Sequence, residues 1–439
     1  MFNSPLLLTV FNGVGRLVNF ALYLVVANLF GASQSTDWFF FVYAVAYFFI
    51  GICYYATESA LVPAWHQLPE EEHPRLFHSA VRLAFSALPI IGLLLFVSGF
   101  FIAPRQGIMP PDSIAAVFLI CLVLALQPSL AFLSSFFSSY RQYNRQYILP
   151  TIHLTLRTVG VLVVLFLVPY RTIMVLSLAY LAGELLRLFC LRYGQLRGNS
   201  SSESPVLSGK SLWSTYGHVV WMTMALMCTV INPVIDLAMV GDFRGGSVTL
   251  VEYAGRLRGM PVLALGGLLV YFLGEWSHQH HQKGKLLAWK QVNRSFITLI
   301  LFCLPVVIFL MMSEKLWVPL VFFSKKFTLE DLQQLQQLLY WYFPGVVFLA
   351  GSLVLSRAIL VIQQARMMAL VTLAAAGINI ILNLLLIKMM GLAGVALSTT
   401  LVDIFVCLMY YLVVRWFLRQ SVFHERDKTV GVSKTLSGL

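Results

Sequence analysis

The chain has 439 residues, of which 59% are hydrophobic and only 11% are charged, whereas a soluble domain carries about 25% charged residues. This composition excludes a soluble globular enzyme and predicts an all-α polytopic membrane protein. The net charge of +12 has no hydrophilic domain to carry it, which argues against a nucleic-acid binder and indicates the basic cytoplasmic loops of a membrane protein.

Apolar runs long enough to cross a bilayer, about 20 residues each, recur along the whole chain. The predicted spans, about twelve, cover 5–30, 38–63, 80–103, 113–138, 147–168, 172–191, 216–241, 257–276, 295–313, 338–361, 367–388 and 391–415. The first run has no small-residue cleavage site, so we expect it to remain as a span. The segment 322–343 is predicted to lie along the exterior membrane surface before the tenth span. The connections are too short to hold a soluble catalytic domain.

A Ser-rich polar stretch, RYGQLRGNSSSESPVLSGKS, separates two halves with a weak mutual likeness. We predict a six-helix lobe at 1–195, a cytoplasmic linker at 196–214, a second six-helix lobe at 215–418 and a basic cytoplasmic tail at 419–439. Parallel halves of this kind are a known transporter architecture, with substrate bound between them. Basic residues concentrate in alternate loops and in the tail, which places both termini in the cytoplasm.

Charged residues inside the spans are informative, because a charge at mid-membrane costs about 2.5–3.5 kcal/mol. The set comprises Arg16, Glu58, Arg157, Glu184, Arg187, Asp236, Arg256, Arg357 and Asp403. We expect Arg187, Arg357 and Glu184 to lie near the interface and extend toward the headgroups, and the same is the default for Arg256 at the start of the eighth span. Arg16 lies deep in the first span and needs an anion, either a fixed carboxylate or a substrate phosphate.

A second group of polar residues has the donor chemistry of a cation site. Asp236 follows Pro233, which frees a backbone carbonyl, and Asn379 and Asn383 share one face of the eleventh span. With Thr399 they offer oxygen ligands and one formal charge, which suits sodium. The alternative is that the asparagines form hydrogen bonds between helices.

The sequence surroundings of the other candidate residues argue against a functional site. The histidines His278, His280 and His281 lie in a Lys-containing cytoplasmic loop, which favours a solvated loop over a metal site. The six cysteines lie in apolar runs and are expected to be reduced packing residues. No GxxxxGK[ST] motif is present, so an ATPase is excluded. No cofactor is predicted other than the candidate sodium ion.

Four stretches of the chain resemble a known family in order along nearly its whole length. They are LFGASQSTDWFF, then NPVIDLAMV with SVTLVEYAGRLRGMPVLALGG, then VPLVFFSKKFTLEDL, and finally SRAILVIQQARMMALVTLAAAGINIILNLLLIKMMGLAGVALSTTL. These residues resemble the MviN/MurJ-type lipid II flippases of the multidrug/oligosaccharidyl-lipid/polysaccharide exporter superfamily. The resemblance implies two six-helix lobes around a central cation-lined cavity in the bacterial inner membrane.

The resemblance also implies residue roles. Arg16 and Arg256 match cavity arginines of the family, whereas the positions of two others align near Leu22 and Ile50. The family's sodium site aligns with Asp236, Asn379, Asn383, Val395 and Thr399, with Asn383 standing where a carboxylate is common. Glu58 is a further candidate substrate-binding residue.

The expected function is a flippase that moves an undecaprenyl-diphosphate-linked oligosaccharide to the periplasmic leaflet. Family members usually add two C-terminal helices, so the glycan could be lipid II or a related cell-wall or exopolysaccharide precursor. The expected partners are this substrate, membrane lipids and the machinery of envelope glycan synthesis. The alternatives are a cation-coupled drug or metabolite antiporter of the same superfamily, favoured by Glu58 and Asp236, and a membrane glycan polymerase or ligase.

Overall fold

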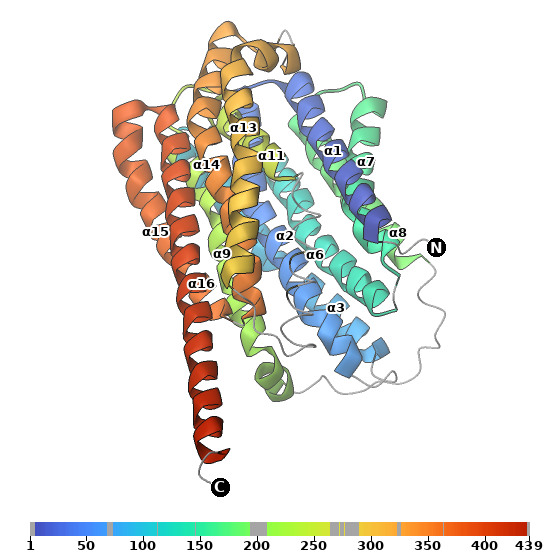
Figure 1. Ribbon diagram of the computed structural model, residues 1–439. Helices are drawn as coiled ribbons and strands as arrows, with labels where there is room; N and C mark the ends of the chain where they lie inside the picture. The colour runs from blue at the N-terminus through green and yellow to red at the C-terminus, as the bar shows by residue number, and fades with distance from the viewer. Residues whose placement is uncertain are drawn as a thin grey trace.

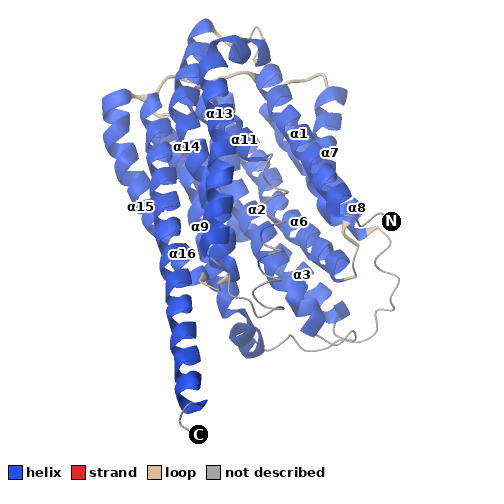
Figure 2. Ribbon diagram, viewed as in Figure 1, coloured by secondary structure: helices blue, strands red, loops and turns tan. Residues whose placement is uncertain are grey.

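The computed structural model describes residues 5–67, 73–111, 113–144, 146–193, 209–263, 272, 276, 289–322, 326–362 and 364–436. Within these residues the regular structure is entirely helical (Figure 2). Ten of the described helices are long and apolar enough to cross a membrane, and the shorter apolar segment Thr223–Met239 adds another. The eighth predicted span extends beyond the described residues, so the expected architecture of about twelve helices agrees with what is described. The predicted all-α polytopic fold is confirmed.

The first half of the chain packs as one group of helices. Its long members are α1 (Pro5–Phe30), α2 (Gln34–Gln67), α6 (Ile114–Tyr143), α7 (Ile148–Leu167) and α8 (Ile173–Arg192). In this group α2 and α8 pack on α6, and α7 packs on α8 and α1 (Figure 1).

The third predicted span is divided into short elements rather than continuous. They are α3 (His73–Ser86), α4 (Leu88–Val97), the π-helical turn η2 (Ser98–Ile102) and α5 (Ala103–Arg105). Pro89 in the first turn of α4 has no N–H to bond to the preceding helix, which accounts for the break after Ser86. In the π turn, the carbonyl of Gly99 accepts a hydrogen bond of 2.9 Å from the indole of Trp38.

The second half forms a similar group. Its members are α9 (Gly209–Met239), α10 (Ser247–Arg258), α11 (Met260–Leu263), α13 (Trp289–Val321), α14 (Leu329–Val361), α15 (Ala365–Met390) and α16 (Leu392–Leu436). Here α14 packs on α16 and α13, and α15 packs on α9 and α16.

Two helix starts in the second half differ from the sequence prediction. Helix α10 begins at Ser247, ahead of the eighth span predicted from 257, because Gly246 takes a left-handed conformation (φ +100°) and ends the preceding turn. Helix α14 begins at Leu329 behind a capping box of Thr328 and Asp331. From Leu329 onward, the predicted surface segment is therefore continuous with the tenth span and is not a separate element.

The two groups meet along one seam, at which α2 packs on α9 and on α10, and α1 packs on α10. The site described below lies at this seam. The predicted domain limits at 195, 214 and 418 remain predictions, since 194–208 lie outside the described residues.

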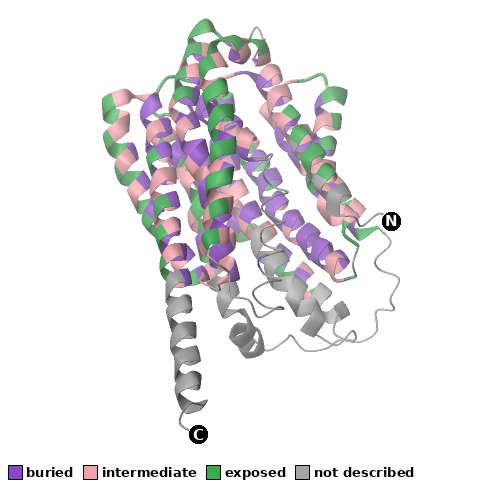
Figure 3. Ribbon diagram, viewed as in Figure 1, coloured by how far each residue is buried: buried purple, intermediate pink, exposed green. Residues whose placement is uncertain are grey.

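Burial distinguishes central helices from peripheral ones (Figure 3). In α6 and α14, 67% and 61% of the membrane-spanning window is buried, compared with 17% in α13. The exposed residues of α13 are large and apolar, among them Leu301, Phe302, Phe309 and Met312. Outward apolar side chains suit a lipid surface, so α6 and α14 form the cores of the two groups and α13 lies at the periphery.

Candidate functional site

A cavity of about 260 Å³ lies at the seam, walled by α2, α9, α10, α14 and α16. Its lining is apolar except for a few convergent polar groups, which is the usual character of a small-molecule site. The polar and charged lining residues are Tyr47, Thr229, Asp236, Glu252, Arg256, Arg258, Tyr342 and Thr399.

Arg256 is the cation held between the two groups of helices. It lies in the last turn of α10 and forms an ion pair of 2.7 Å with Glu252, one turn earlier. Its guanidinium also lies over the rings of Tyr23 on α1 and Tyr47 on α2, at 4.8 and 5.1 Å from their centroids. The side chain is 24% exposed. The default expectation that Arg256 extends to the membrane surface is wrong, because its partners hold it at the seam.

A second ion pair joins α10 to α16. Arg258 donates a hydrogen bond to Asp403, and its guanidinium lies over the ring of Tyr342 at 5.5 Å. Asp403 was among the in-span charges of the sequence, but its partner was not predicted. Helical spacing could have suggested this partner. Arg258 is two residues beyond Arg256, so the two side chains lie on opposite faces of α10, and that of Arg258 points toward the rest of the second group.

The predicted cation-site residues lie together beside this cavity. Asp236 accepts hydrogen bonds from the amide nitrogens of Asn379 (2.8 Å) and Asn383 (2.7 Å), and one of 3.4 Å from the Thr399 hydroxyl. Thr399 in turn donates to the carbonyl of Val395 at 2.9 Å. Three helices, α9, α15 and α16, thus bring one carboxylate, two amides, a hydroxyl and a carbonyl to one place.

The donor set of this cluster fits a monovalent cation. The side-chain oxygen of Asn379 is buried and has no hydrogen-bond partner among the described residues. Rotation of that amide would present the oxygen beside Asp236, and the resulting ligands would all be oxygens with one formal charge. The Asn383 oxygen already accepts from Ser398, so the same rotation there costs a hydrogen bond. The sodium assignment remains a prediction.

Among the described side chains, the charges in and beside the cavity do not balance. Asp236, Glu252 and Asp403 carry three negative charges when ionised, whereas Arg256 and Arg258 carry two positive ones. One negative charge is therefore in excess, and a bound monovalent cation would cancel it.

The side chains of Arg16 and Glu58 lie outside the described residues, although their backbones belong to α1 and α2. His278, His280 and His281 lie outside the described residues altogether. The sequence predictions for these residues remain predictions.

The expectation that Arg187 and Glu184 extend to the headgroups is wrong. Their side chains are 1% and 0% exposed, and they form an ion pair of 3.1 Å inside the first group of helices. The two residues are three positions apart on α8, and Glu184 also pairs with Arg157 on α7, so partners inside the first group replace the headgroups. Hydropathy cannot indicate the partner on the neighbouring helix.

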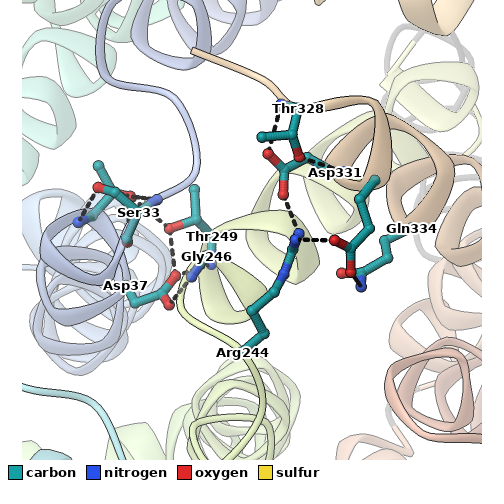
Figure 4. A network of polar contacts seen from close by, with 10 residues as sticks. Ser33, Asp37, Arg244, Gly246, Thr249, Thr328, Asp331 and Gln334 are labelled. Carbon is teal, nitrogen blue, oxygen red and sulfur yellow. Dashed lines mark hydrogen bonds and ion pairs between the residues drawn. The ribbon is translucent and has the colours of Figure 1, made fainter.

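The two groups are bonded to each other beyond one end of the cavity (Figure 4). Asp37 at the start of α2 accepts hydrogen bonds from the backbone nitrogens of Gly246 (2.6 Å) and Thr249 (2.7 Å), and from the Thr249 hydroxyl (2.7 Å). A residue of the first group thus caps the N-terminus of α10 in the second group.

Two further bonds close the same end. The ammonium group of Lys326 donates to the carbonyl of Leu29 at the end of α1. The hydroxyl of Tyr253 donates to the carbonyl of Gly31 at 3.4 Å. This end of the seam is therefore sealed by polar bonds.

Known proteins share the sequence pattern of this chain and the arrangement of its helices. The sequence profile of the family described as "Lipid II flippase MurJ" matches residues 26–434. The chain belongs to the MurJ lipid II flippase family. A MurJ relative from Thermotoga maritima, described as a probable lipid II flippase, is 25% identical over 396 residues, which cover 88% of this chain and 79% of that protein. The family predicted from the resemblance is confirmed, and membership assigns the chain to transporters rather than catalytic enzymes.

Solved structures share the fold. A MurJ lipid II flippase in an inward closed conformation has a TM-score of 0.80 at 18% identity, over 93% of this chain and 87% of that one. An inward-facing multidrug resistance transporter of the MATE family, in the same MOP superfamily, has a TM-score of 0.72 at 12% identity, over 92% and 95%. The chain is therefore a multi-pass membrane protein with the MOP transporter fold.

Proposed function

We propose that this protein is a flippase for lipid II or a related undecaprenyl-diphosphate-linked glycan. The observation that carries the proposal is Arg256, a guanidinium held at the seam of two lobes, inside a cavity sealed at one end. A guanidinium suits phosphate oxygens, which it can bind through two parallel hydrogen bonds. Without substrate, the carboxylate of Glu252 neutralises the guanidinium of Arg256. When substrate binds, its phosphate replaces Glu252 as the partner of Arg256.

The proposed direction runs from the cytoplasmic to the periplasmic leaflet of the bacterial inner membrane by alternating access. The positive-inside distribution of basic residues supports cytoplasmic termini, and it puts the end sealed by Asp37 on the periplasmic side. The arginines would replace the hydration of the diphosphate, the polar cavity would hold the sugars, and the polyprenyl tail would stay in lipid. The membrane lipids and the envelope glycan synthesis machinery are the proposed partners.

We propose sodium or the membrane potential as the driving force. The potential supplies about 2.3 kcal/mol per charge per 100 mV, and it favours outward movement of an anion and inward movement of sodium. The Asp236 cluster supports sodium, because a cation there would cancel the excess negative charge of the cavity and so strengthen its attraction for an anion.

A cation-coupled antiporter is the second candidate. The same excess of carboxylates at the cavity favours it, since drugs carried by such transporters are cations. The two candidates differ in their dependence on Arg256, which an exporter of cations does not need.

The test is complementation of a bacterial strain whose own lipid II flippase is depleted. We expect the wild-type gene to keep the cells alive, and Arg256→Ala and Arg16→Ala to abolish the rescue. Arg105→Ala, which removes an exposed arginine away from the cavity, is the matched control and should rescue fully. No rescue by an expressed, membrane-inserted wild-type protein would overturn lipid II as the substrate. Full rescue by Arg256→Ala would overturn the role of the guanidinium.

A further inference from the structure

A buried cluster of charges in the first lobe lies apart from the cavity described above. Arg157 on α7 forms an ion pair of 2.7 Å with Glu184 on α8, and Glu184 pairs with Arg187 on its other oxygen at 3.1 Å. Arg157 also donates a hydrogen bond of 2.7 Å to the hydroxyl of Tyr43. Arg187 donates one of 3.3 Å to Nδ1 of His153.

Among the described side chains, this cluster carries one positive charge in excess. Two guanidiniums share the carboxylate of Glu184, and Nδ1 of His153 must be unprotonated to accept from Arg187, which makes that ring neutral. An excess charge in a membrane-spanning lobe is costly, so binding of an anion at this cluster would be favourable.

Arg157 is the member that can accept that partner. Its side chain is 13% exposed, whereas those of Arg187 and Glu184 are 1% and 0% exposed. Its Nε lies close to Glu184, yet the two atoms lack the alignment of a hydrogen bond. Because Glu184 is also paired with Arg187, Arg157 can exchange partners without leaving a lone buried carboxylate.

Arg157 faces the same aromatic cluster as Arg256. The Tyr43 hydroxyl that binds Arg157 belongs to a ring 6.1 Å from the ring of Tyr47, and Arg256 lies over Tyr47. One arginine from each lobe thus borders a shared patch of tyrosines at the seam.

We propose that Arg157 is a second anion-binding residue of the substrate site, which together with Arg256 forms a two-point clamp for the diphosphate of a polyprenyl-diphosphate lipid. This inference rests on the proposed function. Arg157 binds one phosphate from the first lobe while Arg256 binds the other from the second lobe. The clamp selects a diphosphate over a monophosphate, because a single phosphate reaches only one of the two guanidiniums.

The test measures binding of undecaprenyl diphosphate and undecaprenyl monophosphate to the full-length protein in nanodiscs by native mass spectrometry. We expect the wild type to prefer the diphosphate. Arg157→Gln should weaken diphosphate binding by about 10- to 100-fold and monophosphate binding by less than about threefold, the range for losing a charge-assisted hydrogen bond. Arg192→Gln is the matched control, since it removes the same charge from an exposed arginine of the first lobe that lies outside the cluster. It should leave the preference unchanged.

The outcomes separate this inference from the function on which it rests. A wild type that binds neither lipid overturns the proposed function and the clamp with it. A wild type that prefers the diphosphate, with Arg157→Gln retaining that preference or Arg192→Gln losing it equally, overturns the clamp alone. If Arg157→Gln does not insert into the membrane, Arg157→Lys is the deciding variant. It keeps the positive charge but loses the planar guanidinium that can donate two parallel hydrogen bonds, so the preference for the diphosphate should fall by about 3- to 10-fold. An unchanged preference in Arg157→Lys also overturns the clamp.

Discussion

Asp37 should control how readily the end of the seam that it seals, which is the exterior end in the proposed orientation, opens. Its carboxylate is 4% exposed and accepts three hydrogen bonds from the start of α10, so Asp37→Ala leaves two backbone N–H groups of that helix without their acceptor. Loss of a helix cap costs about 0.5–2 kcal/mol, and a hydrogen bond to a charged group is worth about 1.5–3 kcal/mol. A penalty of about 2–4 kcal/mol on the closed form shifts the population toward the exterior-open form by about 30- to 800-fold.

The opening can be measured with a cysteine placed in the cavity. Thr229 lines the cavity, and Thr229→Cys in a background without the six native cysteines gives one reporter thiol. A membrane-impermeant maleimide added outside intact cells should label this thiol slowly in the parent and much faster with Asp37→Ala. Asp37→Asn should give an intermediate rate, because the amide keeps one acceptor oxygen and loses the charge.

Asp242→Ala provides the matched control, since it removes an exposed carboxylate from the turn that precedes α10. Its labelling rate should equal that of the parent. The reasoning is refuted if Asp37→Ala inserts normally and its labelling rate stays at the parental value, or if Asp242→Ala accelerates labelling as much.

Two further predictions concern packing and the cation site. A Cβ on Gly183 would lie 2.5 Å from the backbone oxygen of Arg157, so Gly183→Ala should destabilise the α7–α8 contact by about 1–3 kcal/mol and lower the melting temperature in detergent. Gly377→Ala meets nothing within 4 Å and should be neutral or slightly stabilising, and equal melting of the two variants would contradict the packing argument. Sodium, but not potassium, should raise the melting temperature of the wild type, and Asp236→Asn should remove that effect because Asp236 is the single carboxylate of its cluster. A sodium effect that survives in Asp236→Asn would exclude this cluster as the site.

The sequence was informative wherever one helix face or one apolar run carried the signal. Asn379 and Asn383 could be placed on the same face from their spacing, and they do bind one carboxylate. The sequence grouped that pair with Asp236 by donor chemistry and the family resemblance supported the grouping, whereas no local pattern links α9 to α15. Arg256 was singled out as an in-span charge and matched to a cavity arginine by the resemblance, but its span was predicted to start too late, at 257. Glu252 therefore lay outside the predicted spans, and its pairing with Arg256 was missed.

Local sequence patterns could not predict the contacts between the two lobes. Asp37 and Thr249 are 212 residues apart, and nothing near either residue specifies the other. Arg157 and Glu184 show the related failure for buried charges: hydropathy gives the depth of a residue in the membrane but not whether a partner exists on the adjacent helix.

The peripheral position of α13 has a consequence for how this sequence can diverge. A lipid surface requires only that the outward-facing residues of α13 be apolar. Leu301, Phe302 and Phe309 can therefore be replaced by other apolar residues with little loss of stability. The interior of α6 is different, because Ser134, Ser135 and Ser138 are fully buried and a larger side chain there would push the neighbouring helices apart. Substitution of apolar residues on the lipid-facing surface, at constant interior volume, leaves the packing of the helices intact, and a solved MurJ structure with 18% identity to this chain superposes with a TM-score of 0.80.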